Sequence, residues 1–507
     1  MKLNYKKTFF VGTAFFLICL FWQAYDAIIP KILTDKFGLS QTASGAIMAL
    51  DNILALFMLP LFGAISDKAN FKHGKRTPFI VVGTLIAACM FVGLSFADNM
   101  QLTRLDAVTP EKQTAAMEVL YDADLTVKTP MGEEIEICER FSKEEFLSFT
   151  DIESREYTDY VVPARQAYAW NQTKQSPVTL VVFMVMLLVV LVAMATFRSP
   201  AVALMPDVTV KPLRSKANAV INLMGTLGGA LVLVLGIVFG TGKPANALMS
   251  YIPYFTLVAG IMLLMLLLFI LNVREVKWAK EMQEESLALG IEENAPEAEG
   301  KEERKLSKSE FRSLIFILLS VMLWFMGYNA VTSKYSVYAG AVLGLDYNLT
   351  LIIANAAAIV SYLPVGMISS KIGRKKMILI GVCMLFVAFL SAAFLRQGTP
   401  GWVMIILFSL AGIGWAAINV NSYPMVVELA SGSNTGKFTG FYYTASMAAQ
   451  TVTPIISGIF MDWKMVTLFP YAAIFVALAF VTMLFVKHGD SKPEAPKGAM
   501  EAFHDND

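Results

Sequence analysis

Twelve apolar stretches of helix-spanning length are the feature of this 507-residue sequence that most limits its fold. A bilayer core about 30 Å thick needs about 20 apolar residues in a helix to cross it. Because lipid offers the backbone no hydrogen-bond partner, each stretch is expected to be helical. We therefore predict an all-α membrane protein with twelve transmembrane helices. The predicted spans are Thr8–Pro30, Ser44–Ser66, Phe79–Ala97, Pro177–Ala203, Ala219–Phe239, Ile252–Leu271, Ser313–Ala339, Thr350–Ser370, Met377–Leu395, Trp402–Tyr423, Phe438–Phe460 and Leu468–Val486.

Composition argues against a water-soluble enzyme. Hydrophobic residues make up 56% of the chain and charged residues 16%, whereas soluble domains have about 45–50% and about 25%. The four cysteines form no metal or disulfide pattern. We find no nucleotide loop, metal cluster or nucleophile–base pair, so we expect no enzyme and no cofactor. The basic residues lie in short runs between apolar stretches, which is not typical of a nucleic-acid-binding face.

Lysines and arginines in the short loops predict the orientation, because such residues favour the cytoplasmic side. Basic runs such as Lys72–Arg76 and Lys371–Lys376 alternate with loops that hold few bases. We expect an integral, multi-pass protein of the plasma (inner) membrane with both termini cytoplasmic. The expected divisions are residues 1–97 with 176–272 (first half), 98–175 (insertion), 273–312 (cytoplasmic linker), 313–487 (second half) and 488–507 (cytoplasmic tail, expected to be disordered).

The insertion between the third and fourth spans is acidic. Residues 98–175 contain sixteen acids and eight bases, so they are expected to be soluble and extracytoplasmic. Apolar residues alternate with the acids, which suggests a small α/β or hairpin-containing subdomain. The second half joins its equivalent spans through Arg396–Gly401 alone. We therefore predict that transport does not require the insertion.

The two halves of the chain are internal repeats in the same orientation. Seven identical pairs separated by 303 positions cover two spans and the turns beside them without a gap. Two parallel six-helix halves with a substrate site between them are a known transporter plan. The pairs are Tyr25 with Tyr328, Ala27 with Ala330, Lys31 with Lys334, Asn52 with Asn355, Gly63 with Gly366, Ser66 with Ser369, and Lys68 with Lys371.

Acidic residues are the main difference between the repeats. Each acid of these spans in the first half is replaced by an uncharged residue in the second: Asp26 by Asn329, Asp51 by Ala354, and Asp67 by Ser370. Charged groups within the membrane are costly and usually functional. A coupling cation needs its carboxylate in one place only, so we interpret Asp26 and Asp51 as cation- or proton-coupling residues. Drift after duplication, a structural pair and a hydrated helix end remain alternatives.

The loop after the second span carries a family signature. Gly63-Ala64-Ile65-Ser66-Asp67-Lys68, followed by Gly74-Lys75-Arg76, resembles the loop motif of the major facilitator superfamily. Its spacing, with Ser199–Asp207 at the end of span four, resembles the sucrose–proton symporters and the glycoside–pentoside–hexuronide cation symporters. The resemblance covers the membrane part of the chain and implies the major facilitator fold. It also implies that Asp67, Lys75 and Arg76 hold helices together at the cytoplasmic side in the outward-open state.

The chain departs from the plant-type sucrose carriers at two points. Those carriers have an arginine where this chain has Val202, and an acid within span four, where Leu180–Phe197 has none. Arg198 lies one helical turn before Val202 on the same face, so we propose that it takes the guanidinium role. Coupling then depends on Asp26 or Asp51.

Sugar recognition needs hydroxyl partners and a flat apolar surface. Aromatic and amide side chains occupy equivalent places in the two halves, although interfacial anchoring and helix joining are alternative roles for them. The predicted substrate-binding residues are Trp22, Gln23, Tyr25, Asn52, Arg198, Trp324, Tyr328, Asn329, Asn355, Asn419, Asn421, Tyr442 and Gln450. The predicted cytoplasmic gate residues are Asp67, Lys75, Arg76, Asp207 and Glu428, with solvated helix-end acids as the alternative for the last two.

These observations predict a secondary active transporter that works by alternating access. We expect a monomer in the lipid bilayer that takes up a sugar or glycoside, sucrose- or maltose-like, with H⁺. Coupling to Na⁺ with another small polar solute is one alternative. The other is a transporter-like sensor or receptor that uses its external domain.

Overall fold

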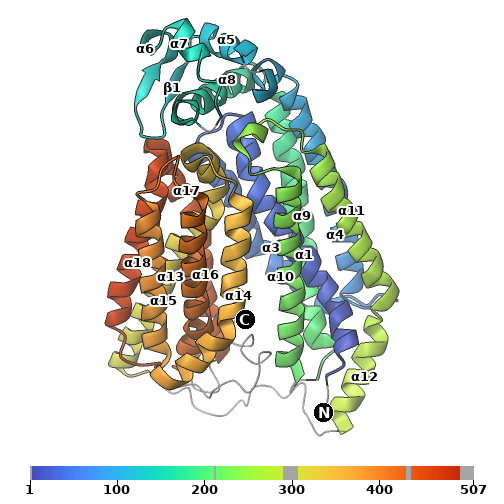
Figure 1. Ribbon diagram of the computed structural model, residues 1–507. Coiled ribbons are helices and arrows are strands. Elements are labelled where there is room, and N and C mark those ends of the chain that lie inside the picture. The colour runs from blue at the N-terminus through green and yellow to red at the C-terminus, as the bar shows by residue number, and fades with distance from the viewer. Residues whose placement is uncertain are drawn as a thin grey trace.

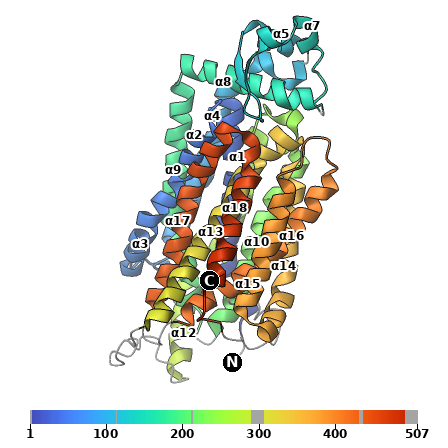
Figure 2. The ribbon, with the colours of Figure 1, turned by 90° about the vertical axis from the view of Figure 1, so that its left-hand side faces the viewer.

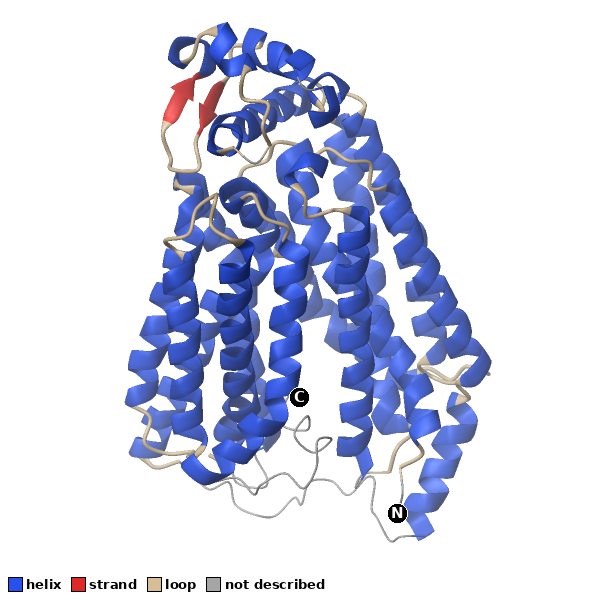
Figure 3. Ribbon diagram, in the orientation of Figure 1, coloured by secondary structure: helices blue, strands red, loops and turns tan. Residues whose placement is uncertain are grey.

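The computed structural model describes residues 3–112, 114–152, 154–210, 213–288, 306–429 and 435–490. Nearly all of this chain is helical, and the strands lie in one small region (Figure 3). Two helical bundles stand side by side beneath that region, and helix α1 begins at the opposite end (Figure 1). We call residues 103–176 the cap, the end of the bundles beside it the cap end, and the opposite end the linker end.

The first half contains six long helices, the second of which is interrupted at Ala49. A π-helical turn over Ile32–Lys36 extends the first helix toward the cap. After the sixth helix, the shorter helix α12 (Glu275–Ala288) begins the linker. The six are α1 (Tyr5–Lys31), α2 with α3 (Gln41–Met48 and Leu50–Lys68), α4 (Thr77–Leu102), α9 (Val178–Asp207), α10 (Arg214–Phe239) and α11 (Ile252–Asn272).

The second half also contains six long helices. Its first helix starts with a capping box, in which Ser307 and Glu310 satisfy each other's free backbone N–H groups. The tail that was predicted to be disordered covers residues 488–507, of which 491–507 lie outside the described chain. The six are α13 (Lys308–Tyr338), α14 (Tyr347–Ile372), α15 (Arg374–Ala392), α16 (Gly401–Val427), α17 (Thr435–Trp463) and α18 (Leu468–Leu484).

Every predicted span coincides with one of these helices. Ten of the described helices are long and apolar enough to cross a membrane. The other two predicted spans correspond to α14, in which Tyr347–Tyr362 is an apolar helix, and to α17. The all-α membrane fold is thus confirmed, and the number of twelve crossings stays a prediction.

The cap is a small subdomain with a hydrophobic core of its own, which includes Leu120, Phe146 and Val161. A two-stranded antiparallel hairpin pairs Thr126 with Glu136 and Lys128 with Glu134. The cap therefore has the hairpin that its alternating sequence suggested. Its helices and strands are α5 (Thr114–Asp122), β1 (Thr126–Lys128), β2 (Glu134–Glu136), α6 (Ile137–Arg140), α7 (Lys143–Leu147) and α8 (Val162–Gln175).

The cap contacts both halves of the bundle, as the perpendicular view in Figure 2 helps to follow. On the first half, the Gln166 side chain donates to Asp35 Oδ1 at 3.0 Å. On the second half, the Thr158 hydroxyl donates to Gln397, and Val466 N donates to the Pro130 carbonyl at 3.4 Å. The insertion is therefore a bridge between the halves as well as a surface domain.

The start of the insertion differs from the predicted boundary. Helix α4 continues past Ala97 to Leu102, so Asp98 belongs to the bundle. Its Oδ2 lies 2.6 Å from Lys36 Nζ, and both side chains are fully buried. Gln101, one turn later, donates to the Lys36 carbonyl at 3.0 Å. These two residues fix the end of α1 against α4 because a buried charge needs a partner.

Candidate functional site

A cavity of about 590 Å³ lies between the two halves. Helices α3 and α9 form its first-half wall, and α13, α16 and α17 form its second-half wall. Polar groups in the wall include amides, hydroxyls and tyrosines, and Arg198 is the charged residue among the described lining residues. The lining extends to Leu59 and Pro206, which lie toward the linker end of α3 and α9. The size falls within the range of about 300–1,000 Å³ that is typical of small-molecule sites.

Two carboxylates and one guanidinium form a charged cluster beside this cavity. Asp26 on α1, Asp51 on α3 and Arg198 on α9 are close enough to interact electrostatically. No ion pair within 4.0 Å joins Arg198 to either acid in the described chain. Asp51 accepts a hydrogen bond of 2.9 Å from the Asn52 amide. The guanidinium instead lies 5.6 Å from the centre of the Trp22 ring, which is a cation–π geometry.

Aromatic side chains form a flat surface in the second half. The rings of Tyr328 on α13 and Trp415 on α16 are stacked, with centroids 3.6 Å apart and planes 2° apart. The Phe325 ring packs nearly perpendicular to the Trp415 ring, with centroids 5.2 Å apart, and Phe325 lines the cavity. In the first half, Trp22 packs edge-on against Tyr25. The Trp22 Nε1 and Tyr25 hydroxyl are buried without a hydrogen-bond partner among the described residues.

Five of the thirteen predicted substrate-binding residues line the cavity: Asn52, Arg198, Asn419, Tyr442 and Gln450. Val202 lines it together with Arg198, as their spacing on one helix face predicts. The cavity also includes Ser199, Ser446 and Tyr423, which the sequence analysis did not single out. The polar spacing of α17 could have indicated Ser446, since it lies one turn before Gln450.

The other predicted residues lie outside the cavity lining. Gln23 faces α10 near Gly229, and Trp324 and Tyr25 are fully buried. Asn421 is buried as well, where it accepts from the Ser369 hydroxyl and donates to the Ala417 carbonyl at 2.9 Å. This geometry makes Asn421 a link between α14 and α16. Trp22 contacts the charged cluster through Arg198, and Tyr328 belongs to the stacked aromatic pair. Asn329 on α13 and Asn355 on α14 are half-buried and lie outside the cavity lining.

The halves are joined to each other at the cap end. Asp462 at the end of α17 accepts from the backbone N–H groups of Gln41 and Thr42 at 2.5 and 2.8 Å. The ammonium of Lys334 donates to the Gln41 carbonyl at 2.8 Å. Gly458 permits this approach, because a Cβ there would lie 2.4 Å from the same carbonyl. These contacts close the interface between α2 and α17 on the cap side of the cavity.

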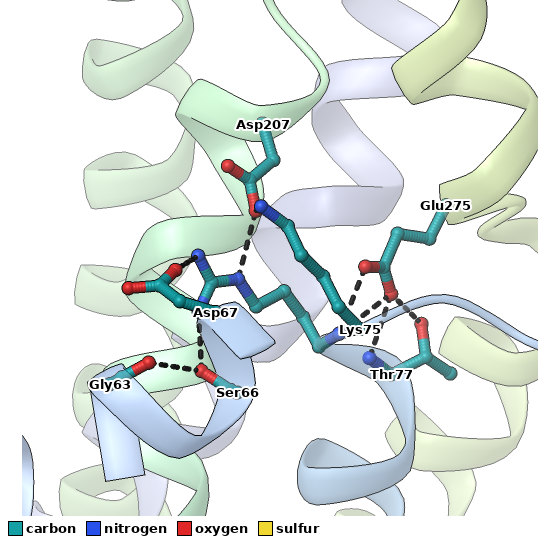
Figure 4. Close-up of polar contacts among 8 residues, drawn as sticks. Gly63, Ser66, Asp67, Lys75, Thr77, Asp207 and Glu275 are labelled. Atoms are coloured by element: carbon teal, nitrogen blue, oxygen red, sulfur yellow. Dashed lines mark hydrogen bonds and ion pairs between the residues drawn. The ribbon is translucent and has the colours of Figure 1, made fainter. Parts of the chain in front are cut away.

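At the linker end, Arg76 connects the start of α4 to α3 and α9, and Figure 4 shows its partners Ser66, Asp67 and Asp207. Its Nε lies 2.8 Å from Asp207 on α9, and its other nitrogens donate to Asp67 and Ser66 on α3. Lys75 lies 3.2 Å from the same Asp207 carboxylate. The predicted gate residues of the first half are thus brought together within one half. Among the described ion pairs, none joins them to the second half.

Glu275 completes this network and was not predicted. Its carboxylate accepts from the N–H groups of Arg76 and Thr77 at 2.9 and 2.8 Å, and from the Thr77 hydroxyl at 2.7 Å. Gly74, at φ +109°, allows the close approach. Because free N–H groups at a helix start attract anions, Glu275 fixes α12 to α4.

The second half has a simpler arrangement at the same end. Arg374 at the start of α15 donates to Glu428 at 2.7 Å. The Lys375 N–H donates to Asp490 at 2.9 Å, next to Gly373 at φ +94°. An acid directly after the last span of each half, Glu275 and Asp490, is the sequence signal that could have revealed both contacts.

Family models match most of the chain. The model described as Major Facilitator Superfamily matches residues 167–395 and 347–504. A second model, described as MFS/sugar transport protein, matches residues 11–110. No curated protein matches the chain by sequence.

Solved structures with the same fold include several transporters. The inward-open conformation of the xylose transporter XylE from E. coli has a TM-score of 0.59 at 15% identity, covering 97% of this chain and 98% of that chain. The nucleoside transporter NupG has a TM-score of 0.55 at 14% identity, with coverages of 96% and 100%. A peptide transporter, POT, has a TM-score of 0.58 at 11% identity, with coverages of 95% and 93%. These similarities show the fold.

Proposed function

Because the chain belongs to the Major Facilitator Superfamily, we propose that it is a secondary transporter that takes up a sugar or glycoside together with a proton. The cavity between the halves, with a charged cluster on its first-half side, carries this proposal. We further propose that the protein works as a monomer in the plasma (inner) membrane, with the linker end facing the cytoplasm.

The cavity wall supports a polyhydroxylated substrate. Asn52, Asn419 and Gln450 offer amide donors and acceptors from both halves, and Ser199 and Ser446 add hydroxyls. Each hydroxyl of a sugar both donates and accepts, so such a mixed wall can satisfy it. The apolar face of a sugar ring can pack against Phe325, whose ring joins the stacked Tyr328–Trp415 pair. The match of residues 11–110 to the sugar transport model agrees with this class.

The charged cluster supports coupling to one cation. With both acids ionised, Asp26, Asp51 and Arg198 together carry one net negative charge. Binding of a single proton makes the cluster neutral, which is the state that a low-dielectric interior favours. Since Asn52 bonds Asp51 and also lines the cavity, substrate bound at Asn52 would contact the cluster directly. This geometry supports a link between substrate occupancy and protonation of the cluster.

The arrangement of the halves supports an inward-facing state. The contacts between α2 and α17 close the cap side, and the cavity lining reaches Leu59 and Pro206 toward the linker end. A cycle of alternating access requires these cap-end contacts to break while new ones form at the linker end.

The proposal is tested by counterflow in proteoliposomes. Proteoliposomes that contain the purified protein are loaded with one unlabelled sugar at a time. Entry of the same sugar in labelled form is then followed with and without a pH gradient. We expect exchange of at least one mono- or disaccharide and its uphill accumulation when the lumen is alkaline. Binding without exchange would favour a receptor. Accumulation driven by a Na⁺ gradient alone would favour sodium coupling.

A further inference from the structure

A second large cavity, which we call the basic groove, lies on the first half at the linker end. Its volume is about 890 Å³. The groove is formed by the loop before α4 with the first turns of that helix, and by the end of α11 with the first turns of α12. Transport between the halves does not involve this surface, because the lining contains no residue of the second half.

One side of the groove is apolar and belongs to membrane-spanning helices. Val82 on α4 is 52% exposed, and Ile270 and Leu271 at the end of α11 are 46% and 64% exposed. Both helices are long and apolar enough to cross a bilayer. In a membrane these side chains contact acyl chains, so this side of the groove is a surface for lipid tails.

The other side of the groove is basic. Lys72 from the loop before α4, and Arg274, Lys277 and Lys280 at and after the start of α12, all line it with exposed side chains. Among described residues, Lys277 is paired with Glu281 at 3.8 Å. No ion pair of Lys72, Arg274 or Lys280 is present in the same described part of the chain.

Glu275 is the acid of the groove, and it does not neutralise these cations. Its carboxylate already accepts from two backbone N–H groups and from the Thr77 hydroxyl. The residue is 3% exposed. The groove therefore presents a positive surface directly beside an apolar one.

We propose that the basic groove binds a phospholipid with a net negative headgroup, such as phosphatidylglycerol. The acyl chains lie along Val82 and Leu271, and the headgroup phosphate lies among Lys72, Arg274 and Lys280. Cations next to a span attract anionic lipids through charge, and each adds to the binding. A zwitterionic lipid offers the same tails without the net charge, so it fits the apolar side only. The bound lipid would hold α12 beside α4.

Lipid titration of the detergent-solubilised full chain tests this proposal. The melting midpoint is followed while phosphatidylglycerol, phosphatidylcholine or inorganic phosphate is added, since a ligand of the folded state raises it. We expect phosphatidylglycerol to raise the midpoint most. The double variant Lys72→Gln with Lys280→Gln is expected to weaken its apparent affinity by about thirtyfold. Lys277 is kept because it pairs with Glu281.

The matched control is the double variant Lys371→Gln with Lys376→Gln, which removes two exposed lysines beside the equivalent helix of the second half. It should bind phosphatidylglycerol like the parent. Native mass spectrometry of the bound lipid gives a second readout that does not depend on the stability of the variants. Equal protection by phosphatidylcholine or by inorganic phosphate would overturn the proposal. Unchanged phosphatidylglycerol binding in the Lys72/Lys280 variant would overturn it too.

Discussion

The two halves share one scaffold at the linker end and differ in the charges that they place on it. In each half, an arginine at the start of the third helix pairs with an acid at the end of the fourth: Arg76 with Asp207, and Arg374 with Glu428. In each half, an acid that follows the last helix also accepts a hydrogen bond from a backbone N–H at the start of the third helix. A glycine with positive φ precedes that N–H in both halves. The duplicated contacts are those that hold neighbouring helices together.

The differences concern ionic groups. Arg76 also binds Asp67 and Ser66, whereas position 370, which is equivalent to Asp67, is a serine. At the centre, Asp26 and Asp51 have the uncharged counterparts Asn329 and Ala354. The comparison indicates that the packing contacts are retained in both halves, and it is the basis of the proposal that cation coupling resides in the first half.

The largest expected effect comes from Arg198→Gln, which removes the cation beside the two acids. Removing one member of a buried set of charged side chains costs about 2–5 kcal/mol of binding free energy. We therefore expect substrate exchange to fall by about a hundredfold or more. Arg198→Lys keeps the charge and should retain part of the activity. Exchange is measured per folded molecule. Near-normal exchange in the glutamine variant would place substrate recognition in the second half instead.

Substitution of Arg76 and of Arg374 compares how much the linker-end contacts of each half stabilise the protein. Arg76 is 4% exposed and has partners on two other helices, whereas Arg374 is 13% exposed and its ion pair in the described chain is with Glu428 on one other helix. We expect Arg76→Gln to lower the free energy of unfolding by about 2–3 kcal/mol, and Arg374→Gln by about 1 kcal/mol or less. Melting in detergent compares the two directly. Equal losses would mean that the additional contacts of Arg76 do not stabilise the first half.

The cap is a further difference, because it is inserted in the first half alone. Replacing residues 106–156 with a short Gly/Ser linker keeps Gln101 and α8. It removes the β1–β2 hairpin and the segment that directly precedes Thr158. We expect a folded protein with exchange retained and with greater cysteine accessibility at the cap end, because contacts to Val466 are lost. A well-folded deletion that neither binds nor exchanges substrate would make the cap part of the site and favour the receptor alternative.

A smaller effect is expected from Asp67→Asn. Asp67 is 61% exposed while it bonds Arg76, so it has room for another partner when the linker end closes. If it stabilises that closed state, its loss shifts the population toward the inward-open state. A change of about 1–2 kcal/mol corresponds to about a tenfold shift. Cysteine labelling from both sides of the membrane measures it, and unchanged labelling would count against a gating role.

The helices and the repeat were predictable because they depend on apolar length and on identical residues at one offset. Polar contacts between residues far apart in the sequence were harder to predict. Asp98 was assigned to an acidic surface loop, but α4 runs five residues further than its apolar window and places Asp98 against Lys36. Asn421 was predicted to contact substrate, but it bonds Ser369 instead. An amide or a carboxylate that binds substrate or faces water has the same sequence pattern as one that joins two helices. Only the packing of the helices decides which of these roles it has.

The central claim, that cation coupling resides in the first half, is tested most directly at Asp26. Asp26→Asn copies the residue of the second half, Asn329, and removes one titratable group with little change in shape. In proteoliposomes with a pH gradient, we predict that this variant exchanges substrate but no longer accumulates it uphill, and that substrate entry no longer carries protons. Proton-driven accumulation at the parent level would contradict the claim for Asp26 and leave Asp51 as the coupling acid.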